Sequence, residues 1–371
     1  MTDSIQKMSI FYNDKMLEYK APPGMFDSTP SAYLERQIDQ PEGSDRICNT
    51  VSVLQNSMLN ERLSWFDPKP ASDESILTFH TAEYLDRLKK AQNTAHYFTP
   101  STYMVQGGMS FIRMSAGCAV DAADSVVRGE TKIAYAISRP PSHHAQPDVA
   151  DGYCFVNGVG LIVHHALNNG FKRVAVVDWD VHHGNGTQAG FYDRSDVLAI
   201  SLHMDHGSWG DTHLQTGNVD ETGEGQGEGF NINLPVPFGA GNSTYNELFE
   251  KCVEPAVRKF KPDLIVIANG QDANQFDPNG RQCLTMAGYY ELATRIRKLA
   301  ERYTNGQIVM TQEGGYNPTY APYCAYAVVA GLLNQPMEME DPIALYPDDL
   351  FRSERDVEEL IGRHPLFNGR R

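Results

Sequence analysis

The stretch Val174-Ala-Val-Val-Asp-Trp-Asp-Val-His-His-Gly-Asn-Gly-Thr-Gln188 decides the class of fold. Its first four residues form an apolar run, which is typical of a parallel strand buried on both faces. Because side chains alternate along a strand, Asp178, Asp180 and His182 are expected to point the same way. Buried ionisable groups need partners, and Asp with His at one strand end is typical of a zinc site. The alternative is that these groups only cap the next helix and pair internally.

Strands and helices alternate along the chain from about residue 133 onward. The Gly-Asn-Gly of residues 184–186 predicts a sharp turn into a helix through Thr187 and Gln188. Apolar runs separated by amphipathic segments indicate an α/β fold with a mainly parallel sheet and helices on both faces. The predicted strands are 133–138, 174–178, 197–202, 230–235, 264–268 and 307–312, and the predicted helices are 156–168, 244–260, 286–303 and 318–333.

The first hundred residues show a less regular pattern. Residues 21–30 and 67–70 are rich in proline and are predicted to be loops. Residues 44–63 and 82–91 are predicted to be helices. We find no internal repeat and no evident domain boundary, so residues 1–371 are predicted to form a single domain. Residues 1–70 would be a loop-rich N-terminal extension within it, which covers one face or makes a subunit contact in a homo-oligomer.

Composition narrows the class of protein. The formal net charge of −16 argues against binding to nucleic-acid phosphates, which requires basic patches. An acidic surface would attract amines or basic peptides, or would only keep the protein in solution. Six cysteines without a Cys-x-x-Cys pair indicate a reduced chain. With no visible secretory signal and no apolar stretch of about 18 residues, we expect a cytoplasmic protein with no membrane partner.

Polar residues follow four of the predicted strands. They lie in the segments 139–144, 178–183, 269–272 and 312–316. Sites in open parallel sheets form at the carboxyl ends of the strands, so these segments are expected to meet. Asp180, His182 and Asp272 would leave a zinc ion with an open position for water and substrate. The metal would lower the pKa of its water and polarise a bound carbonyl.

His143 and His144 are candidates for proton transfer, because histidine titrates near neutral pH. Asp178 and Asn185 are plausible partners of the two imidazoles. A carboxylate favours the charged ring and an amide does not, so the two pKa values would separate. Tyr316 follows two glycines and could donate a hydrogen bond to an oxyanion, although a core aromatic is the simpler interpretation.

Two residues near this site have alternative interpretations. Asp178 could instead bind a monovalent cation together with Ser201 and Leu202 at the neighbouring strand end. His183 would point away from the metal and pack below the site.

Seven motifs, in order, resemble those of the histone deacetylase superfamily, in particular its class II-like bacterial amidohydrolases. The resemblance covers roughly residues 75 to 335 and begins at Phe79-His-Thr-Ala-Glu-Tyr-Leu85. The motifs are Arg139-Pro-Pro-Ser-His-His-Ala145, Gly152-Tyr-Cys-Phe-Val-Asn157, Asp178-Trp-Asp-Val-His-His-Gly-Asn-Gly-Thr-Gln188, Ile200-Ser-Leu-His203, Gly270-Gln-Asp-Ala273, Phe276-Asp-Pro-Asn-Gly280 and Glu313-Gly-Gly-Tyr316.

The resemblance implies a three-layer arginase/deacetylase-type fold and a role for each matching residue. Zinc would bind Asp180, His182 and Asp272, and Tyr316 would polarise the carbonyl. His143 and His144 would be the paired histidines, with His144 as general base, and Asn185 follows the class II pattern. The Gly152 carbonyl and the Tyr153 ring would line the acyl channel. A structural potassium ion would bind the side chains of Asp178 and Ser201 and the carbonyls of Asp180, His182 and Leu202.

Several positions depart from the family pattern towards polar residues. They are Ser142, Tyr153, Gln271, Asn279 and the segment 205–214, which is expected to supply the opposite wall of the channel. A hydrophilic pocket penalises substrates that lack matching polar groups, which favours a small molecule over a protein. We therefore predict a zinc-dependent amidohydrolase that removes a small acyl group, most simply acetyl, from an amine. The alternatives are a protein lysine deacetylase, an acetylpolyamine amidohydrolase, a non-catalytic receptor that keeps the metal pocket, and an arginase-type enzyme with two manganese ions.

Overall fold

The computed structural model describes residues 6–23, 33–36, 39–211, 213–343 and 354–368. Its centre is a parallel sheet of eight strands in the order β2-β1-β5-β10-β9-β6-β7-β8. A separate antiparallel hairpin is formed by β3 (His96–Thr99) and β4 (Thr102–Met104). The sheet strands are β1 (Met8–Phe11), β2 (Leu63–Phe66), β5 (Ile133–Ala136), β6 (Val174–Asp178), β7 (Val197–Met204), β8 (Asn231–Val236), β9 (Leu264–Asn269) and β10 (Ile308–Gln312).

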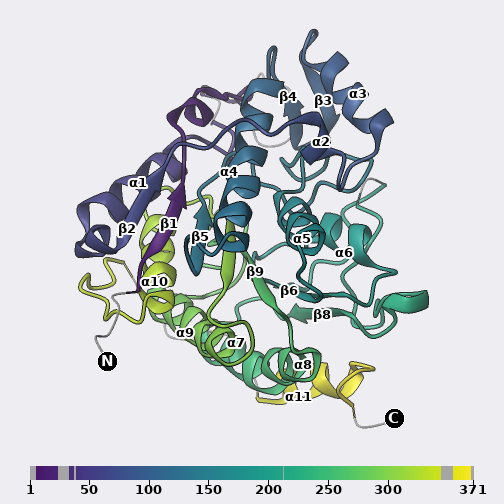
Figure 1. The fold of residues 1–371 in the computed structure, drawn as a ribbon, viewed down its shortest axis with the longest axis vertical. Helices are drawn as coiled ribbons and strands as arrows, with labels where there is room; N and C mark the ends of the chain where they lie inside the picture. Colours follow the sequence, from purple (N-terminus) through teal and green to yellow (C-terminus); the bar gives the residue numbers. More distant parts are fainter. Residues whose placement is uncertain (1–5, 24–32, 37–38, 212, 344–353, 369–371) are drawn as a thin grey trace.

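Helices cover both faces of the sheet (Figure 1). Side chains of β6 show the division, because Ala175 and Val177 pack into one apolar cluster while Val174 and Val176 pack into the other. The first cluster includes α1 (Asp45–Asn56), α7 (Asn242–Leu248), α8 (Glu254–Phe260), α9 (Met286–Tyr303) and α10 (Ala321–Leu332), and the second includes α3 (Ala82–Ala91), α4 (Met109–Val127) and α5 (Gly158–Asn168). This arrangement confirms the predicted three-layer α/β fold.

The six predicted strands are all present, with ends that differ by up to two residues. These strands could be predicted because they are buried on both faces and therefore consist of nearly continuous apolar residues. A helix, α6 (Asn185–Phe191), begins at the predicted Gly-Asn-Gly turn. In the described part of the chain, no helix is long and apolar enough to cross a membrane. The remaining helical elements are α2 (Asp73–Ile76), α11 (Glu354–Arg363), the 3-10 turns Asp14–Glu18, Met58–Arg62 and Gly225–Gly227, and a π-helical turn Phe249–Val253 that joins α7 to α8.

The prediction was least accurate before residue 133. The helix expected over 44–63 ends at Asn56, because Ser57 is extended, and Leu63 then begins β2. β1 was not predicted, yet it lies between β2 and β5 inside the sheet. The helix α4 also escaped prediction. The N-terminal residues are thus more regular than expected, while the predicted loop at 21–30 falls mainly on residues 24–32, which lie outside the described residues.

Strand order brings the predicted site segments together. β5, β10, β9 and β6 are neighbours in that order, although they come from distant parts of the chain. Because the strands are parallel, their carboxyl ends lie at one edge of the sheet. The segments that follow them therefore meet in space.

Candidate active site

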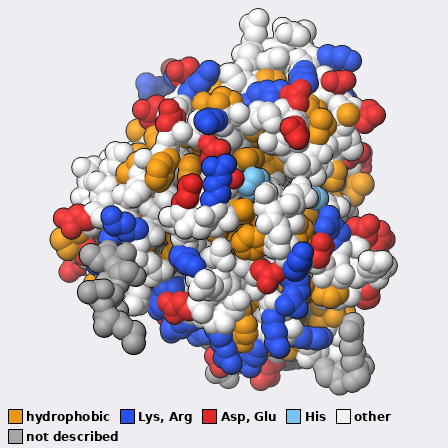
Figure 2. Space-filling model, in the orientation of Figure 1, with side chains coloured by type: hydrophobic (Ala, Val, Ile, Leu, Met, Phe, Trp, Pro, Cys, Tyr) orange, Lys and Arg blue, Asp and Glu red, His pale blue; other side chains and the backbone are white. Residues whose placement is uncertain are grey.

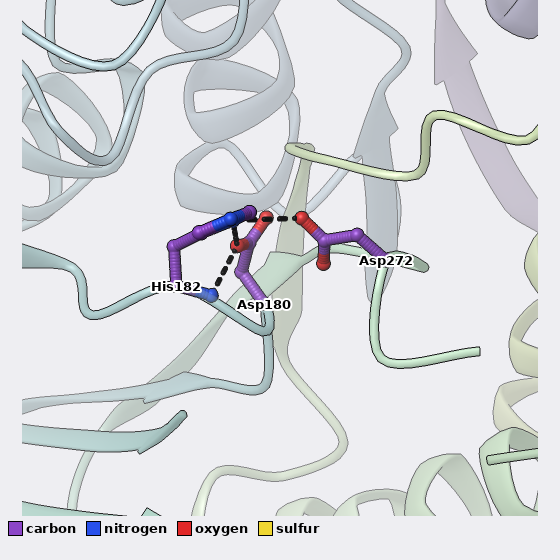
Figure 3. A group of neighbouring side chains, drawn as sticks. All are labelled: Asp180, His182 and Asp272. Carbon is purple, nitrogen blue, oxygen red and sulfur yellow. Dashed lines mark hydrogen bonds and ion pairs between the residues drawn. The ribbon is translucent and has the colours of Figure 1, made fainter. Parts of the chain in front are cut away.

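Asp180, His182 and Asp272 form a compact group beyond the ends of β6 and β9 (Figure 3). The ring atom Nδ1 of His182 lies 3.2 Å from Oδ1 of Asp180 and 3.1 Å from Oδ2 of Asp272. One ligand atom from each residue lies within 4.8 Å of the others, and both carboxylates are fully buried. The predicted convergence of these three residues is thus present in the structure.

The reason for this convergence differs from the one predicted. β6 ends at Asp178, so strand alternation does not orient Asp180 and His182. Backbone amides hold them instead. The amide of His182 donates to Oδ1 of Asp180 at 2.9 Å, and the amide of Val181 donates to Oδ1 of Asp272 at 2.8 Å. Asp180 and His182 are therefore held by a hydrogen bond within their own loop, and Asp272 accepts a hydrogen bond from the backbone of the same loop.

The electrostatics of this group fit a divalent cation. Burial and then the charge of Asp180 raise the pKa of Asp272. Burial alone would also raise the pKa of Asp180, but the imidazoles of His143 and His182 lower it. Two adjacent buried carboxylates are costly without a positive partner, and two carboxylate oxygens with one imidazole nitrogen form a donor set that suits zinc. Gly314 closes the group, because its amide donates to Oδ2 of Asp180 at 2.7 Å.

His143 and His144 follow β5, and their backbone is held by a buried carboxylate. Glu313 accepts hydrogen bonds from the amide and hydroxyl of Ser142 and from the amide of His143. The two imidazole rings then lie with their centroids 4.0 Å apart. Nδ1 of His143 faces Oδ2 of Asp178 at 2.9 Å, and Nδ1 of His144 faces Oδ1 of Asn185 at 2.7 Å. Both proposed partners are therefore in contact with the histidines expected to need them.

The pKa values of the two histidines shift in opposite directions, because their hydrogen-bond partners differ. Burial would lower the pKa of His143, but the carboxylates of Asp180 and Asp178 outweigh it and raise that pKa well above its usual value. For His144, burial and then the charge of His143 lower the pKa well below its usual value. His143 is therefore charged and His144 neutral near neutral pH.

Tyr316 lies beside this group on the loop after β10. Its ring centroid is 6.4 Å from that of His182. Burial and then the charges of Asp180 and Asp272 raise the pKa of its hydroxyl well above the usual value, so the hydroxyl stays protonated and able to donate. The guanidinium carbon of Arg46 lies over the Tyr316 ring, 5.5 Å from its centroid. Tyr316 is thus a proton-bearing group next to the candidate metal site.

A cavity of about 390 Å³ opens over these groups. Figure 2 shows histidine atoms reaching the surface near the middle of one face, with acidic and basic side chains close by. Gly152 and Tyr153 line the cavity as predicted, and the Tyr153 ring lies 5.6 Å from that of Tyr316. The complete lining is Thr99, Pro100, Ser101, His144, Asp151, Gly152, Tyr153, His182, Trp209, His213, Pro278, Asn279, Arg281 and Tyr316.

Only some of the polar departures face this cavity. Tyr153 and Asn279 do, with Nδ2 of Asn279 3.5 Å from the Tyr153 hydroxyl. Gln271 instead points into the interior, where its amide donates to the Asn269 carbonyl at 2.8 Å. Ser142 binds Glu313 and is also buried. The expectation that Gln271 and Ser142 make the pocket hydrophilic is therefore not supported by their positions.

Sequence reasoning did not name Asp151, Thr99, Pro100, Ser101 or Arg281 as cavity residues, and it named His213 only within the segment 205–214. Nδ1 of His213 lies 3.4 Å from Oδ2 of Asp151, and both side chains are buried. The segment 205–214 had been assigned to the channel wall as a whole, and Trp209 and His213 are its members that line the cavity. An aspartate directly before the Gly152-Tyr153 pair was the available signal for Asp151.

The residues proposed for potassium lie together at one end of β6 and β7. Asp178 on β6 lies opposite Ser201 on β7, and Leu202, the residue after Ser201, is buried. The hydroxyl of Ser201 lies 2.9 Å from Nδ1 of His203. His183 is buried below the site and contacts Oε1 of Gln188 at 2.9 Å, consistent with the packing role expected for it. Potassium binding itself stays a prediction.

Known proteins resemble this chain over most of its length. The family model described as histone deacetylase domain matches residues 40–332. Histone deacetylase 8 of Arabidopsis thaliana is 42% identical over 366 residues, which is 97% of each chain. A histone deacetylase-like amidohydrolase of Pseudomonas aeruginosa is 39% identical over 337 residues, 88% of this chain and 87% of its own. The crystal structure of the HDA15 HD domain has a TM-score of 0.79 and 30% identity, covering 89% of this chain and 90% of that chain.

Proposed function

The chain belongs to the histone deacetylase family, and from that premise we propose that it is a zinc-dependent amidohydrolase that removes a small acyl group, most simply acetyl, from an amine. One observation carries the proposal. A buried carboxylate-imidazole-carboxylate group borders, through His182, a cavity that is also lined by a neutral histidine, His144, and a protonated tyrosine, Tyr316. Metal ligands, a base and an oxyanion donor are the parts that metal-assisted amide hydrolysis requires.

Asp180, His182 and Asp272 would hold the zinc ion. When bound there, zinc supplies a water of lowered pKa and polarises the substrate carbonyl. Asp178, Ser201 and the neighbouring carbonyls of Asp180, His182 and Leu202 are kept as a proposed potassium site, supported by the register of β6 and β7.

His144 would act as the general base. Its Nδ1 is occupied by Asn185, so Nε2 is the nitrogen available to take a proton from water. His143 does not line the cavity, so we assign the transfer of that proton to the leaving amine to His144 as well. Burial and then the charge of His143 would keep the pKa of His144 low. The hydroxyl of Tyr316 would donate a hydrogen bond to the oxygen on which negative charge develops.

A small acylated amine is the favoured substrate, because the cavity wall carries polar groups of Tyr153, Asn279 and His213. Polar groups at these positions favour substrates that make matching hydrogen bonds. The relative from Pseudomonas aeruginosa is a histone deacetylase-like amidohydrolase. Deacetylation of protein lysine is the second candidate, supported by the full-length similarity to a histone deacetylase of Arabidopsis thaliana.

The test is turnover on a matched panel by the full chain, stripped of metal and reloaded with zinc. The panel comprises an acetyl-lysine peptide, free acetyl-lysine, acetylputrescine and a simple aryl acetamide. We expect zinc-dependent hydrolysis with the highest kcat/KM on a free small amide. Asp180→Ala should abolish turnover, whereas Asp86→Ala, an exposed substitution on α3, should not. Preference for the peptide would favour the second candidate, and no hydrolysis of any amide would refute the proposed function.

A further inference from the structure

We propose that Asp151 is a positioning residue that sets the orientation of Asn185 and, through it, the tautomer of His144. The inference rests on the proposed function in so far as His144 is the general base. Asp151 was not expected from the sequence to have a role, and the hydrogen bonds that carry the inference join it to Gly152 and Asn185.

The carboxylate of Asp151 is held in one place. It is 6% exposed and lies in the loop that precedes Gly152 and Tyr153. Oδ1 accepts a hydrogen bond from the Gly152 amide at 2.9 Å. Oδ2 accepts from Nδ2 of Asn185 at 3.2 Å and lies 3.4 Å from Nδ1 of His213. The backbone is closed by two hydrogen bonds between Asp151 and Cys154. The acceptor oxygen presented to Asn185 is therefore well ordered.

A chain of hydrogen bonds follows from the chemistry of these groups. An ionised carboxylate can only accept, so Asn185 must turn its NH₂ group towards Asp151. The amide oxygen of Asn185 then faces His144, where it lies 2.7 Å from Nδ1. An amide oxygen can only accept, so Nδ1 of His144 must carry the proton. In the neutral ring Nε2 is then unprotonated, as a general base requires.

Without the carboxylate, either orientation of the Asn185 side chain would be possible. A flipped amide would donate to Nδ1 of His144 and place the proton on Nε2, which cannot then accept a proton from water. The rotation of the imidazole is restricted independently, because Gly152 packs against it. A Cβ on Gly152 would lie 2.2 Å from Cδ2 of His144. The ring is thus placed by Gly152, and its protonated nitrogen is chosen by Asp151.

The first test observes the tautomer directly, without turnover. Long-range ¹H–¹⁵N spectra of the metal-free full chain should show the His144 proton on Nδ1. In Asp151→Asn, a substitution of nearly the same shape, part or all of that proton should move to Nε2. A His144 proton on Nε2 in the wild-type protein would overturn the inference, and so would an unchanged Nδ1 proton in a folded Asp151→Asn variant.

The second test uses kinetics on whichever amide the wild type hydrolyses. Asp151→Asn should lower kcat about 10- to 100-fold, a usual size for losing an outer hydrogen-bond partner, with KM within about twofold. Asp148→Asn, an exposed change in the same loop, is the matched control and should keep wild-type kcat.

Rescue separates positioning from a merely structural role. Asn185→Asp alone would set two carboxylates against each other and should lose most activity. The double variant Asn185→Asp/Asp151→Asn restores a donor facing an acceptor, so its kcat should exceed that of Asn185→Asp at least tenfold. A double variant no better than Asn185→Asp would count against the inference. An inactive wild type would instead refute the proposed function, and the spectra would still decide the role of Asp151.

Discussion

Nδ1 of His143 lies 2.9 Å from the carboxylate oxygen Oδ2 of Asp178. The neighbouring His144 has an amide in the same position relative to its own ring, namely Oδ1 of Asn185. A carboxylate stabilises an imidazolium and an amide does not, so two adjacent histidines of identical chemistry acquire different charges. Of the two, His144 lines the cavity and is the neutral one, so we assign the proton-accepting role to His144.

Asp178→Asn should shift the pH dependence of activity. Loss of the carboxylate lowers the pKa of His143, so that ring becomes neutral at lower pH. Removing its charge raises the pKa of His144, which must be neutral to act as a base. The acidic limb of kcat/KM should therefore move to higher pH, by about one unit. The pH profile of Asp124→Asn, which breaks a similar pair with His165 on α4 and α5, should match the wild type. An unmoved acidic limb in Asp178→Asn would contradict the assignment.

Tyr316→Phe should lower kcat about 10²- to 10³-fold, as expected for loss of one oxyanion donor. The hydroxyl is the only group removed, so zinc affinity and thermal stability should stay close to the wild type. Steady-state kinetics on the best panel substrate provide the measurement. Tyr323→Phe, a half-buried change on α10, serves as control. Activity of Tyr316→Phe within a factor of three of the wild type would exclude the proposed role.

Gly314→Ala should weaken zinc binding. A Cβ at this position would lie 2.0 Å from Oδ2 of Asp272 and 2.7 Å from Oδ2 of Asp180, and neither buried carboxylate has room to retreat. We expect at least a tenfold loss of zinc affinity in competition with a chelator. Gly362→Ala, whose Cβ would contact nothing within 4 Å, should bind zinc like the wild type. Equal affinities in the two variants would show that the loop can move aside.

Glu42→Ala should destabilise the fold. Its Oε1 accepts from Arg46 at 2.8 Å and from Arg139 at 2.9 Å, and all three side chains are almost fully buried. Removing the only carboxylate of this trio leaves two buried guanidinium groups, which should cost about 3–5 kcal/mol in the free energy of unfolding. Glu74→Ala on the exposed side of α2 should change it by less than about 0.5 kcal/mol. Denaturant titration of both variants checks this, and similar values would contradict it.

His80→Gln should reduce the acid sensitivity of the fold. Burial lowers the pKa of His80 to about 4, and its Nε2 accepts a hydrogen bond from the Asn157 amide. Between pH 6.5 and 4 the unfolded chain binds a proton at this ring that the folded chain does not, so stability falls as pH falls. From pH 7 to pH 5 the wild type should lose about 2 kcal/mol more than His80→Gln. The exposed His96→Gln should follow the wild type, whereas parallel curves for all three proteins would refute the prediction.

The fold was readable from residue 133 onward because apolar runs such as 174–178 and 264–268 are buried on both faces. Their composition therefore reports their environment directly. β1 contains a serine and β2 is only partly buried, so neither shows the continuous apolar run that marks the equally short β5. The single helix predicted over 44–63 covers α1, the 3-10 turn Met58–Arg62 and the start of β2, because no apolar run marks where β2 begins.

The sequence by itself determined which residues could do chemistry, because ligand type, the order of the motifs and the glycine turns are local properties. Asp180, His182, Asp272 and the pair His143 and His144 were named as candidates in this way, and the family resemblance added the roles of His144 and Tyr316. Only the tertiary structure decided how they combine. The order β5-β10-β9-β6 places Asp272 beside Asp180, although about ninety residues separate them along the chain. Gln271, next to Asp272, instead donates its side-chain amide to the Asn269 carbonyl in the interior. The link from Asp151 through Asn185 to His144 likewise depends on loops meeting in space, since hydrogen-bond partners are chosen by distance and donor direction rather than by position along the chain.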